Sequence, residues 1–219
     1  MRLRNVKNAS EILNSSKYFV SSPEKYRGKW NTLFGNDNQI MLEIGMGKGD
    51  FIIGMARLHP DWNFIGIEAY ESVLVRAVEK LDMMDLPNVK VLCVNAADIG
   101  SIFDHEVEKI YLNFSDPWPK TRHHKRRLTH ENFLQEYDKI FKWCAAIEMK
   151  TDNDKLFEDS LCYLTTYGYK LDRVSLDLWS TDIEDVRTEY EIKFGMNGYK
   201  IKFLKAHKDD TCHQEASLR

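Results

Sequence analysis

Residues 42–51 read LEIGMGKGDF. An apolar run is followed by Gly45, Gly47 and Gly49, and a helix-like pattern begins directly after them. Glycines are required where a chain turns sharply between a strand and a helix and where its backbone must approach a ligand closely. The stretch therefore predicts the first strand–loop–helix unit of an α/β domain, and it assigns these three glycines to a cofactor loop.

Short apolar runs alternate with longer amphipathic runs on both sides of this glycine loop. The alternation is typical of βαβ units, in which helices cover both faces of a mostly parallel sheet. Residues 169–178 and 199–204 alternate like strands around a helix expected at 182–194, and they predict an antiparallel edge on that sheet. Strands are expected at 39–44, 63–67, 89–94, 109–112 and 143–149, and helices at 50–58, 71–83, 129–141 and 154–166.

The chain divides into three segments by composition. Residues 1–38 are polar with scattered aromatics and are expected to form an N-terminal extension, 39–206 form the main domain, and 207–219 form a flexible tail. With 219 residues, of which 43% are hydrophobic, the chain is large enough to bury a core of its own.

Charge and cysteine content exclude several classes of protein. The net charge is −3, so any contact with nucleic acid must use a local basic patch. The four cysteines form no CxxC pair, which predicts reduced thiols rather than a disulfide framework or a zinc site, and no metal is expected. No apolar stretch approaches the roughly 20 residues that span a bilayer. We expect a cytoplasmic protein with no membrane partner, which is either a monomer or a homodimer.

Acidic residues around the glycine loop favour S-adenosylmethionine as the cofactor. Glu68 ends the second expected strand, where a carboxylate accepts hydrogen bonds from ribose hydroxyls. Asp50 stands where a dinucleotide would place its pyrophosphate, so the two charges would repel. S-adenosylmethionine carries a sulfonium and an ammonium instead, and these cations suit Glu43. Asn95, after the third strand, is expected to contact the adenine, whereas Asp98 is at least as well explained as a helix N-cap.

A second stretch, residues 113–120, reads NFSDPWPK and follows the fourth expected strand. Its two prolines fix φ and remove backbone donors, so the loop is stiff. Asp116 can accept two hydrogen bonds, which suits the N1–H and the exocyclic amine of guanine, and it is the candidate catalytic residue. Trp118 either stacks on a base or packs beneath the loop.

A basic run follows at once. Residues 120–127 read KTRHHKRR and carry five fixed positive charges in eight residues. Charge runs are usually solvated faces, but this one adjoins the Asp116 loop, which favours contact with RNA phosphates. The predicted RNA-binding residues are Arg122, His123, His124, Lys125, Arg126 and Arg127.

Taken together, these motifs resemble one family, the bacterial tRNA (guanine-N7-)-methyltransferases. The most specific of them is NFSDPWPKTRHHKRRL at 113–128. It is supported by LEIGMGKG at 42–49, GIEAY at 66–70 and TEYEIKF at 188–194. The resemblance extends over residues 30–204.

The resemblance implies a class I methyltransferase fold, a Rossmann-like and mostly parallel seven-stranded sheet with an antiparallel C-terminal strand and helices on both faces. It also implies methyl transfer from S-adenosylmethionine to N7 of the guanosine at position 46 in the tRNA variable loop. The family often has an aspartate where this chain has Asn95. By motif position, the cofactor-side or catalytic residues would be Glu43, Glu68, Asn95 and Asp116, and the substrate-side residues Lys120, Asp152, Thr188, Glu189, Tyr190 and Glu191.

Three other interpretations remain open at this point. Amino-methyltransferases have a related [N/D]-P-P-[Y/F/W] loop, whereas residues 116–119 read Asp-Pro-Trp-Pro. A non-catalytic tRNA-binding protein on the same scaffold would be expected to lose the cofactor residues, and these are present. A NAD enzyme is disfavoured by Asp50.

Overall fold

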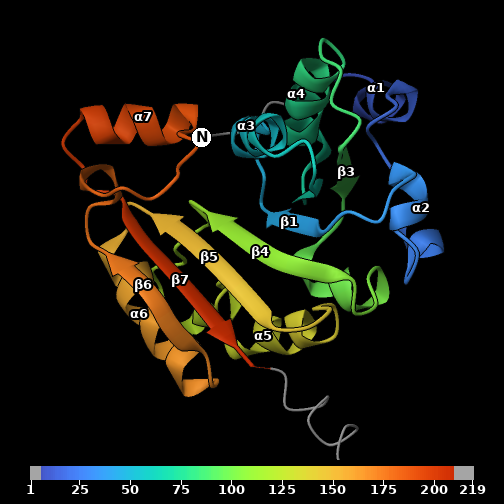
Figure 1. Cartoon of the computed structure of the whole chain (residues 1–219). Helices are drawn as coiled ribbons and strands as arrows, with labels where there is room; N and C mark the ends of the chain where they lie inside the picture. The colour runs from blue at the N-terminus through green and yellow to red at the C-terminus, as the bar shows by residue number, and fades with distance from the viewer. Residues whose placement is uncertain (1–5, 210–219) are drawn as a thin grey trace, which may run out of the picture.

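The computed structural model describes residues 6–209 and contains a seven-stranded sheet in the order β3-β2-β1-β4-β5-β7-β6 (Figure 1). Neighbouring strands from β1 to β5 pair in parallel, while β7 pairs antiparallel with both β5 and β6. This confirms the predicted fold class. The strands are β1 Ile40–Ile44, β2 Asn63–Glu68, β3 Val89–Cys93, β4 Val107–Asn113, β5 Ala145–Thr151, β6 Lys170–Ser175 and β7 Lys202–Lys208.

Helices cover both faces of the sheet, because successive side chains of a strand point to opposite faces. Leu42 of β1 packs into one apolar cluster with α5, α6 and η2, whereas Met41 packs into another with α1, α3 and α4. The α-helices are α1 Ala9–Ser15, α2 Asn31–Phe34, α3 Asp50–Leu58, α4 Glu71–Leu81, α5 Glu131–Asp138, α6 Asp154–Thr166 and α7 Glu189–Met196. The 3-10 helices are η1 Pro23–Tyr26, η2 Ala96–Ser101, η3 Thr121–Arg126 and η4 Leu178–Ser180.

The N-terminal segment packs onto the domain. Trp30 is fully buried, and its indole Nε1 donates to Ile102 O at 3.1 Å. The Tyr18 hydroxyl donates to Met84 O at 2.7 Å, and Val20 N donates to Val91 O of β3 at 3.1 Å. The segment thus covers the otherwise open edge of β3, which protects it from pairing with another chain.

The last strand extends further toward the C-terminus than the sequence predicted. His207 and Lys208 belong to β7, so the prediction of a tail that begins at 207 is wrong, and residues 210–219 lie outside the described residues. β7 lies between β5 and β6, and β6 and β7 together form the antiparallel edge that the sequence predicted. The helix expected over 182–194 begins only at Glu189. Thr188 caps that helix, because its hydroxyl accepts from the Glu191 backbone N–H at 3.0 Å.

Three further features concern the described residues. Cys93, Cys144 and Cys162 are free thiols. In the part of the chain between residues 6 and 209, no helix is long and apolar enough to cross a membrane. Nor do three or more histidine, cysteine, aspartate or glutamate side chains within that range gather in a way that would hold a metal ion.

Candidate active site

The glycine loop joins β1 to α3 through three left-handed residues. Gly45, Gly47 and Gly49 have φ angles of 79°, 56° and 79°, a region that L side chains rarely adopt. A Cβ on Gly45 or Gly47 would meet no atom within 4 Å, so these two glycines leave open space above the loop. The loop is fixed from below, because Ile67 O accepts from Gly45 N at 2.8 Å. An exposed backbone of this kind can be approached closely by a ligand.

Glu43 of β1 lies buried directly beneath this loop, with 3% of its surface exposed. Asn113 at the end of β4 donates from Nδ2 to Glu43 Oε1 at 2.9 Å, while Glu43 Oε2 is buried without a hydrogen-bond partner. Burial raises the pKa of Glu43 to about 8, although Asn113 and the charge of Lys150 oppose the shift. A buried carboxylate with a free oxygen is suited to receive a cation from a ligand.

Glu68 and Asn95, which are predicted to contact the cofactor, each also accept hydrogen bonds from the local backbone. The Glu68 carboxylate accepts backbone N–H groups of Gly47, at 3.1 Å, and of Ala69 and Tyr70. Burial raises the pKa of Glu68, and these bonds oppose that shift. The Asn95 side chain is the N-cap of η2 and accepts from Ala97 N at 2.9 Å. The N-cap role that the sequence allowed for Asp98 therefore belongs to its neighbour Asn95.

Asp50 is not a free charge. Its carboxylate forms an ion pair with Lys80 of α4 and also accepts from Glu189 N at 3.4 Å. A neutralised carboxylate repels a phosphate much less than an isolated one does. Asp50 therefore disfavours a bound dinucleotide less than the sequence suggested. The stronger reason to favour a cationic ligand is the buried oxygen of Glu43 that has no hydrogen-bond partner.

The Asp116 loop is stiffened by more than its prolines. Phe114 and Trp118 have φ angles of 51° and 41°, and Phe114 N donates to Lys150 O at 2.8 Å. Asp116 itself is exposed. Trp118 is half-buried with Arg126 over its ring face at 4.9 Å, so it stacks at the surface rather than in the core.

Arg127 does not belong to the predicted RNA-binding surface. It is 1% exposed, donates from Nε to Pro117 O at 2.7 Å, and pairs with Asp159 of α6. A further bond reaches Trp118 O. A guanidinium that is buried in this way cannot reach a phosphate, and its role is to hold the Asp116 loop against the domain. This corrects the prediction made from the charge run.

The rest of the basic run does form an exposed surface around η3. The side chains of Lys120, Arg122, Lys125 and Arg126 are exposed, and His123 and His124 are half-buried. None of these four cations forms an ion pair with a carboxylate among residues 6–209. Unpaired cations beside the Asp116 loop retain their full attraction for an anionic ligand.

Apart from Lys120, which precedes η3, the predicted substrate-side residues lie where β5 ends and α7 begins, and Figure 1 shows α7 above the ends of β4 and β5. Tyr190 donates from its hydroxyl to Asp152 Oδ2 at 3.2 Å, and Phe114 lies 5.0 Å from the Tyr190 ring. Glu189 is exposed and pairs with Lys48 of the glycine loop at 3.2 Å. The TEYEIKF segment is therefore joined to both predicted loops.

Glu191 is an exception, because its side chain is fully buried. It accepts from Lys150 Nζ at 2.7 Å and from the Trp179 indole at 2.8 Å. The prediction that Glu191 faces the substrate is therefore corrected. Lys150 of β5 also donates to Asp185 at 2.6 Å and to Val186 O at 3.0 Å, so all three of its N–H groups are used.

Sequence reasoning did not single out Asn113 or Lys150, although both lie at the centre of the site. Each directly follows a predicted strand, at 109–112 and 143–149, and the two are register partners in the β4–β5 ladder. The signal that could have found them is a polar residue at the end of an apolar run, directly before the Asp116 loop in one case and before Asp152 in the other.

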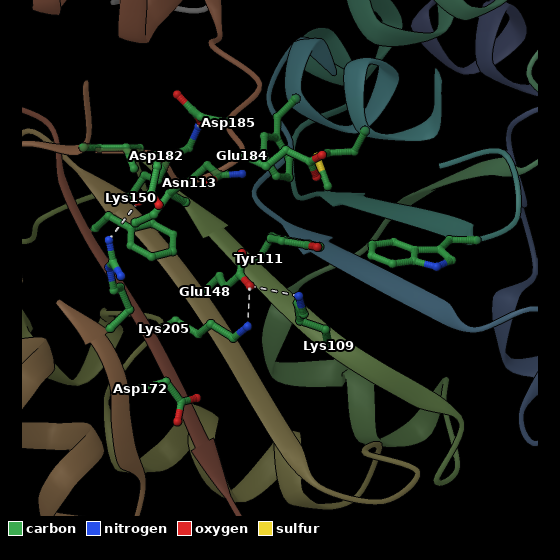
Figure 2. Close-up of a pocket in the computed structure, with 17 residues that line it drawn as sticks. Lys109, Tyr111, Asn113, Glu148, Lys150, Asp172, Asp182, Glu184, Asp185 and Lys205 are labelled. Carbon is green, nitrogen blue, oxygen red and sulfur yellow. Dashed lines mark hydrogen bonds and ion pairs between the residues drawn. The ribbon is translucent and has the colours of Figure 1, made fainter. Parts of the chain in front are cut away.

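A groove of about 480 Å³ opens beside these residues, over β4, β5 and β7 (Figure 2). Figure 2 shows Glu148 between Lys109, at 2.8 Å, and Lys205, at 3.9 Å. The groove reaches Asn113 and Lys150 but contains none of the predicted cofactor residues. Its charges are paired with one another, so it differs from the cationic surface near Asp116.

Comparisons with known proteins identify the family of this chain. A family model described as "Putative methyltransferase" matches residues 37–204. The tRNA (guanine-N(7)-)-methyltransferase of Geobacillus thermodenitrificans is 54% identical over 204 residues, covering 92% of this chain and 94% of that protein. The protein of the same name from Bacillus subtilis is 48% identical, with coverage of 92% and 96%.

Solved structures share the fold at low sequence identity. A 16S rRNA (adenine(1408)-N(1))-methyltransferase from Catenulisporales acidiphilia superposes with a TM-score of 0.61 at 15% identity, covering 84% of this chain and 93% of that one. A SAM dependent methyltransferase from Aquifex aeolicus has a TM-score of 0.54 at 18% identity, with coverage of 91% and 97%. Given its close relatives over nearly the whole length, this chain belongs to the tRNA (guanine-N(7)-)-methyltransferase family.

Proposed function

We propose that this chain transfers the methyl group of S-adenosylmethionine to N7 of a guanosine in tRNA, at position 46 of the variable loop. The observation that carries the proposal is the position of the Asp116 loop. The loop lies between the open glycine loop above Glu43 and the unpaired cations around η3. One side suits a cationic cofactor, and the other suits a phosphate backbone. A tRNA substrate also implies a cytoplasmic location.

The residues present fit S-adenosylmethionine. Glu43 Oε2 is buried and lacks a partner, and the ammonium of this cofactor would supply one. The open backbone at Gly45 and Gly47 would admit the rest of the molecule, and Glu68 and Asn95 would face its ribose and adenine. When bound, the cofactor supplies a methyl group that is activated by a sulfonium.

The remaining chemistry requires little from side chains. Guanine N7 carries no proton at neutral pH and has a free lone pair in the ring plane, so no general base is needed. Catalysis then rests on proximity and alignment, which supply roughly 7–11 kcal/mol in well-oriented reactions. Asp116 would accept hydrogen bonds from the N1–H and the exocyclic amine of guanine, and its charge would offset the positive charge that the base acquires.

The test is nucleoside analysis of tRNA after incubation with the protein and S-adenosylmethionine. We expect 7-methylguanosine in a normal transcript and no product in a transcript with 7-deazaguanosine at the target. Methylation of the deaza transcript would overturn the N7 assignment. Detection of a methylated adenine would favour the amino-methyltransferase alternative. Absence of any product, with tRNA and cofactor both bound, would favour a binding protein on this scaffold.

A further inference from the structure

Four aromatic rings form a continuous row that leads away from the Asp116 loop. Phe114 contacts Tyr190 with ring centroids 5.0 Å apart, Tyr190 stacks on Phe194 at 4.3 Å, and Phe194 meets Tyr199 edge-on at 5.5 Å. The first ring stands two residues before Asp116, and the last stands beyond α7. The row therefore connects the proposed catalytic loop with a second place on the same surface.

That second place is a hollow of about 640 Å³. One wall is Tyr199, which is 55% exposed, and Leu176 is a second apolar residue of the lining, 66% exposed. Asp152, which belongs to the predicted substrate-side residues, also lines it. The hollow is thus contiguous with the candidate active site through Asp152 and the aromatic row. Its complete lining is Asp152, Asn153, Asp154, Leu176, Gly198, Tyr199, Lys200 and Lys202.

The fold fixes Tyr199 in an exposed position. α7 ends in a left-handed Gly198, with φ 85°, and Tyr199 N donates back to Phe194 O at 3.2 Å. This is the usual way in which a glycine ends a helix, and it brings the next side chain onto the last turn. The cap accounts for the contact with Phe194. The cap does not explain why the residue at 199 is a tyrosine that is more than half exposed to water.

The polar groups of the hollow favour a base over a bare phosphate. The ammonium of Lys202 already has two partners, since it donates to Asp152 O at 3.2 Å and pairs with Asp154. Lys200 is 68% exposed and lies 3.4 Å from Asp177. Carboxylates therefore balance the lysines, so the hollow offers an anion little net attraction. Proteins hold unstacked RNA bases by stacking them on aromatic rings and by hydrogen bonds to the base edges, and this hollow offers an exposed ring together with carboxylates.

We propose that Tyr199 and Leu176 form a second base-binding site, which holds an unpaired nucleotide of the tRNA near the target guanosine. The inference rests on the proposed function, because it takes tRNA as the ligand. Tyr199 provides a stacking surface, Asp152 can accept hydrogen bonds from a base edge, and the exposed Lys200 is available to the phosphate backbone of the tRNA. The site contributes to substrate affinity and to the choice of tRNA, not to the chemical step.

The experiment compares Tyr199→Ala, Tyr199→Phe and Leu176→Ala with Trp143→Ala, which removes an exposed ring just before β5, at the opposite end of that strand. Affinity for a tRNA transcript is measured by filter binding. Transcripts with 2-aminopurine, placed in turn at each unpaired position around the target, report stacking by fluorescence quenching. Since base stacking contributes at least about 1 kcal/mol, Tyr199→Ala should weaken binding by about fivefold or more. Tyr199→Phe and Trp143→Ala should bind as the unsubstituted protein does.

Quenching at one position that is retained in Tyr199→Phe and lost in Tyr199→Ala supports the proposal. Unchanged affinity and quenching in Tyr199→Ala overturn it. If that variant does not fold, Leu176→Ala decides, and unchanged tRNA affinity in Leu176→Ala likewise overturns the proposal. Methylation by the unsubstituted protein is measured in parallel. Normal methylation with unchanged affinity in the variants rejects the second site alone, whereas absence of methylation rejects the proposed function.

Discussion

Lys150 Nζ lies 2.7 Å from Glu191 Oε2, and both side chains are buried. Lys150 comes from the central sheet, and Glu191 comes from the helix that carries the predicted substrate-side residues. The ion pair therefore anchors α7 above the ends of β4 and β5. Burial raises the pKa of Glu191, and the charge of Lys150 opposes that shift by favouring the carboxylate.

We predict that Lys150→Met strongly destabilises the protein. The substitution keeps the aliphatic length but leaves the buried Glu191 without its counter-charge and leaves Asp185 with only Arg187, at 3.8 Å. Breaking a buried pair in this way costs about 3–5 kcal/mol. The free energy of unfolding from urea denaturation measures the loss. The matched control is Lys155→Met, whose ion pairs are exposed and should contribute no more than about 1 kcal/mol. Equal losses in the two variants would contradict a structural role for the buried pair.

We predict that Asp116→Asn remains folded and binds S-adenosylmethionine but loses turnover. An amide cannot offset the positive charge of the methylated base, and its N–H groups would face the N–H groups of guanine. Loss of one such group typically lowers kcat by about 10²–10³-fold. Single-turnover methylation of a tRNA transcript measures the rate, and calorimetry measures cofactor binding. Asp98→Asn, at an exposed residue of η2, is the control. A normal rate in Asp116→Asn would remove its catalytic role.

Much of the fold followed from sequence, because periodicity depends on local burial. The glycine loop and the parallel strands were predicted since an apolar run, a turn and an amphipathic run occur in order. The position of β7 between β5 and β6 could not be predicted, because strand order depends on contacts between distant segments. The start of α7 was also predicted wrongly, but for a local reason. The hydroxyl of Thr188 caps the helix, so the helix begins at Glu189 although the helical pattern extends further back.

The candidate site was predictable only in part. Charge patterning located the cationic run but could not distinguish Arg126, which is exposed, from Arg127, which is buried. Adjacent residues of a charged run can have opposite environments, and only the packing of α6 decides between them. Likewise, the sequence suggested Glu191 but not its partner Lys150, because the two are joined only in the folded chain.

The contrast between Arg126 and Arg127 gives a direct prediction. Arg126→Ala should weaken tRNA binding and reduce the slope of log affinity against log salt by about 0.7–0.9, the value expected for one phosphate contact. Its stability should be unchanged. Arg127→Ala should instead lower the free energy of unfolding, because it leaves the carbonyl of Pro117 without its donor and Asp159 with only Lys155 as its partner. Salt-dependent filter binding and urea denaturation measure the two effects.

A reversed pattern would contradict this assignment of the basic run. If Arg126→Ala leaves the salt slope unchanged, the exposed cations around η3 are a solvated face. If Arg127→Ala is as stable as the unsubstituted protein, the buried contacts of its guanidinium do not hold the Asp116 loop.

Glu43 gives a prediction about pH. Burial raises its pKa from 4.5 to about 8, so the folded protein binds this proton more tightly than the unfolded chain does. The stability that the protonated form provides is complete below about 4.5 and is lost as pH rises toward about 8. Glu43→Gln does not titrate. Without cofactor, its free energy of unfolding relative to the unsubstituted protein should therefore increase with pH, at up to about 1.4 kcal/mol per pH unit.

Urea denaturation at about pH 5, 6.5 and 8 measures this difference, with Glu79→Gln on the exposed side of α4 as the control. Glu43→Gln should weaken cofactor binding, because it removes the carboxylate that would receive the ammonium. In the unsubstituted protein near pH 7, binding of S-adenosylmethionine should release a proton, which calorimetry in buffers of different ionisation enthalpy detects. Parallel stability profiles for Glu43→Gln and the unsubstituted protein, together with binding that releases no proton, would show that Glu43 is already ionised in the protein without cofactor.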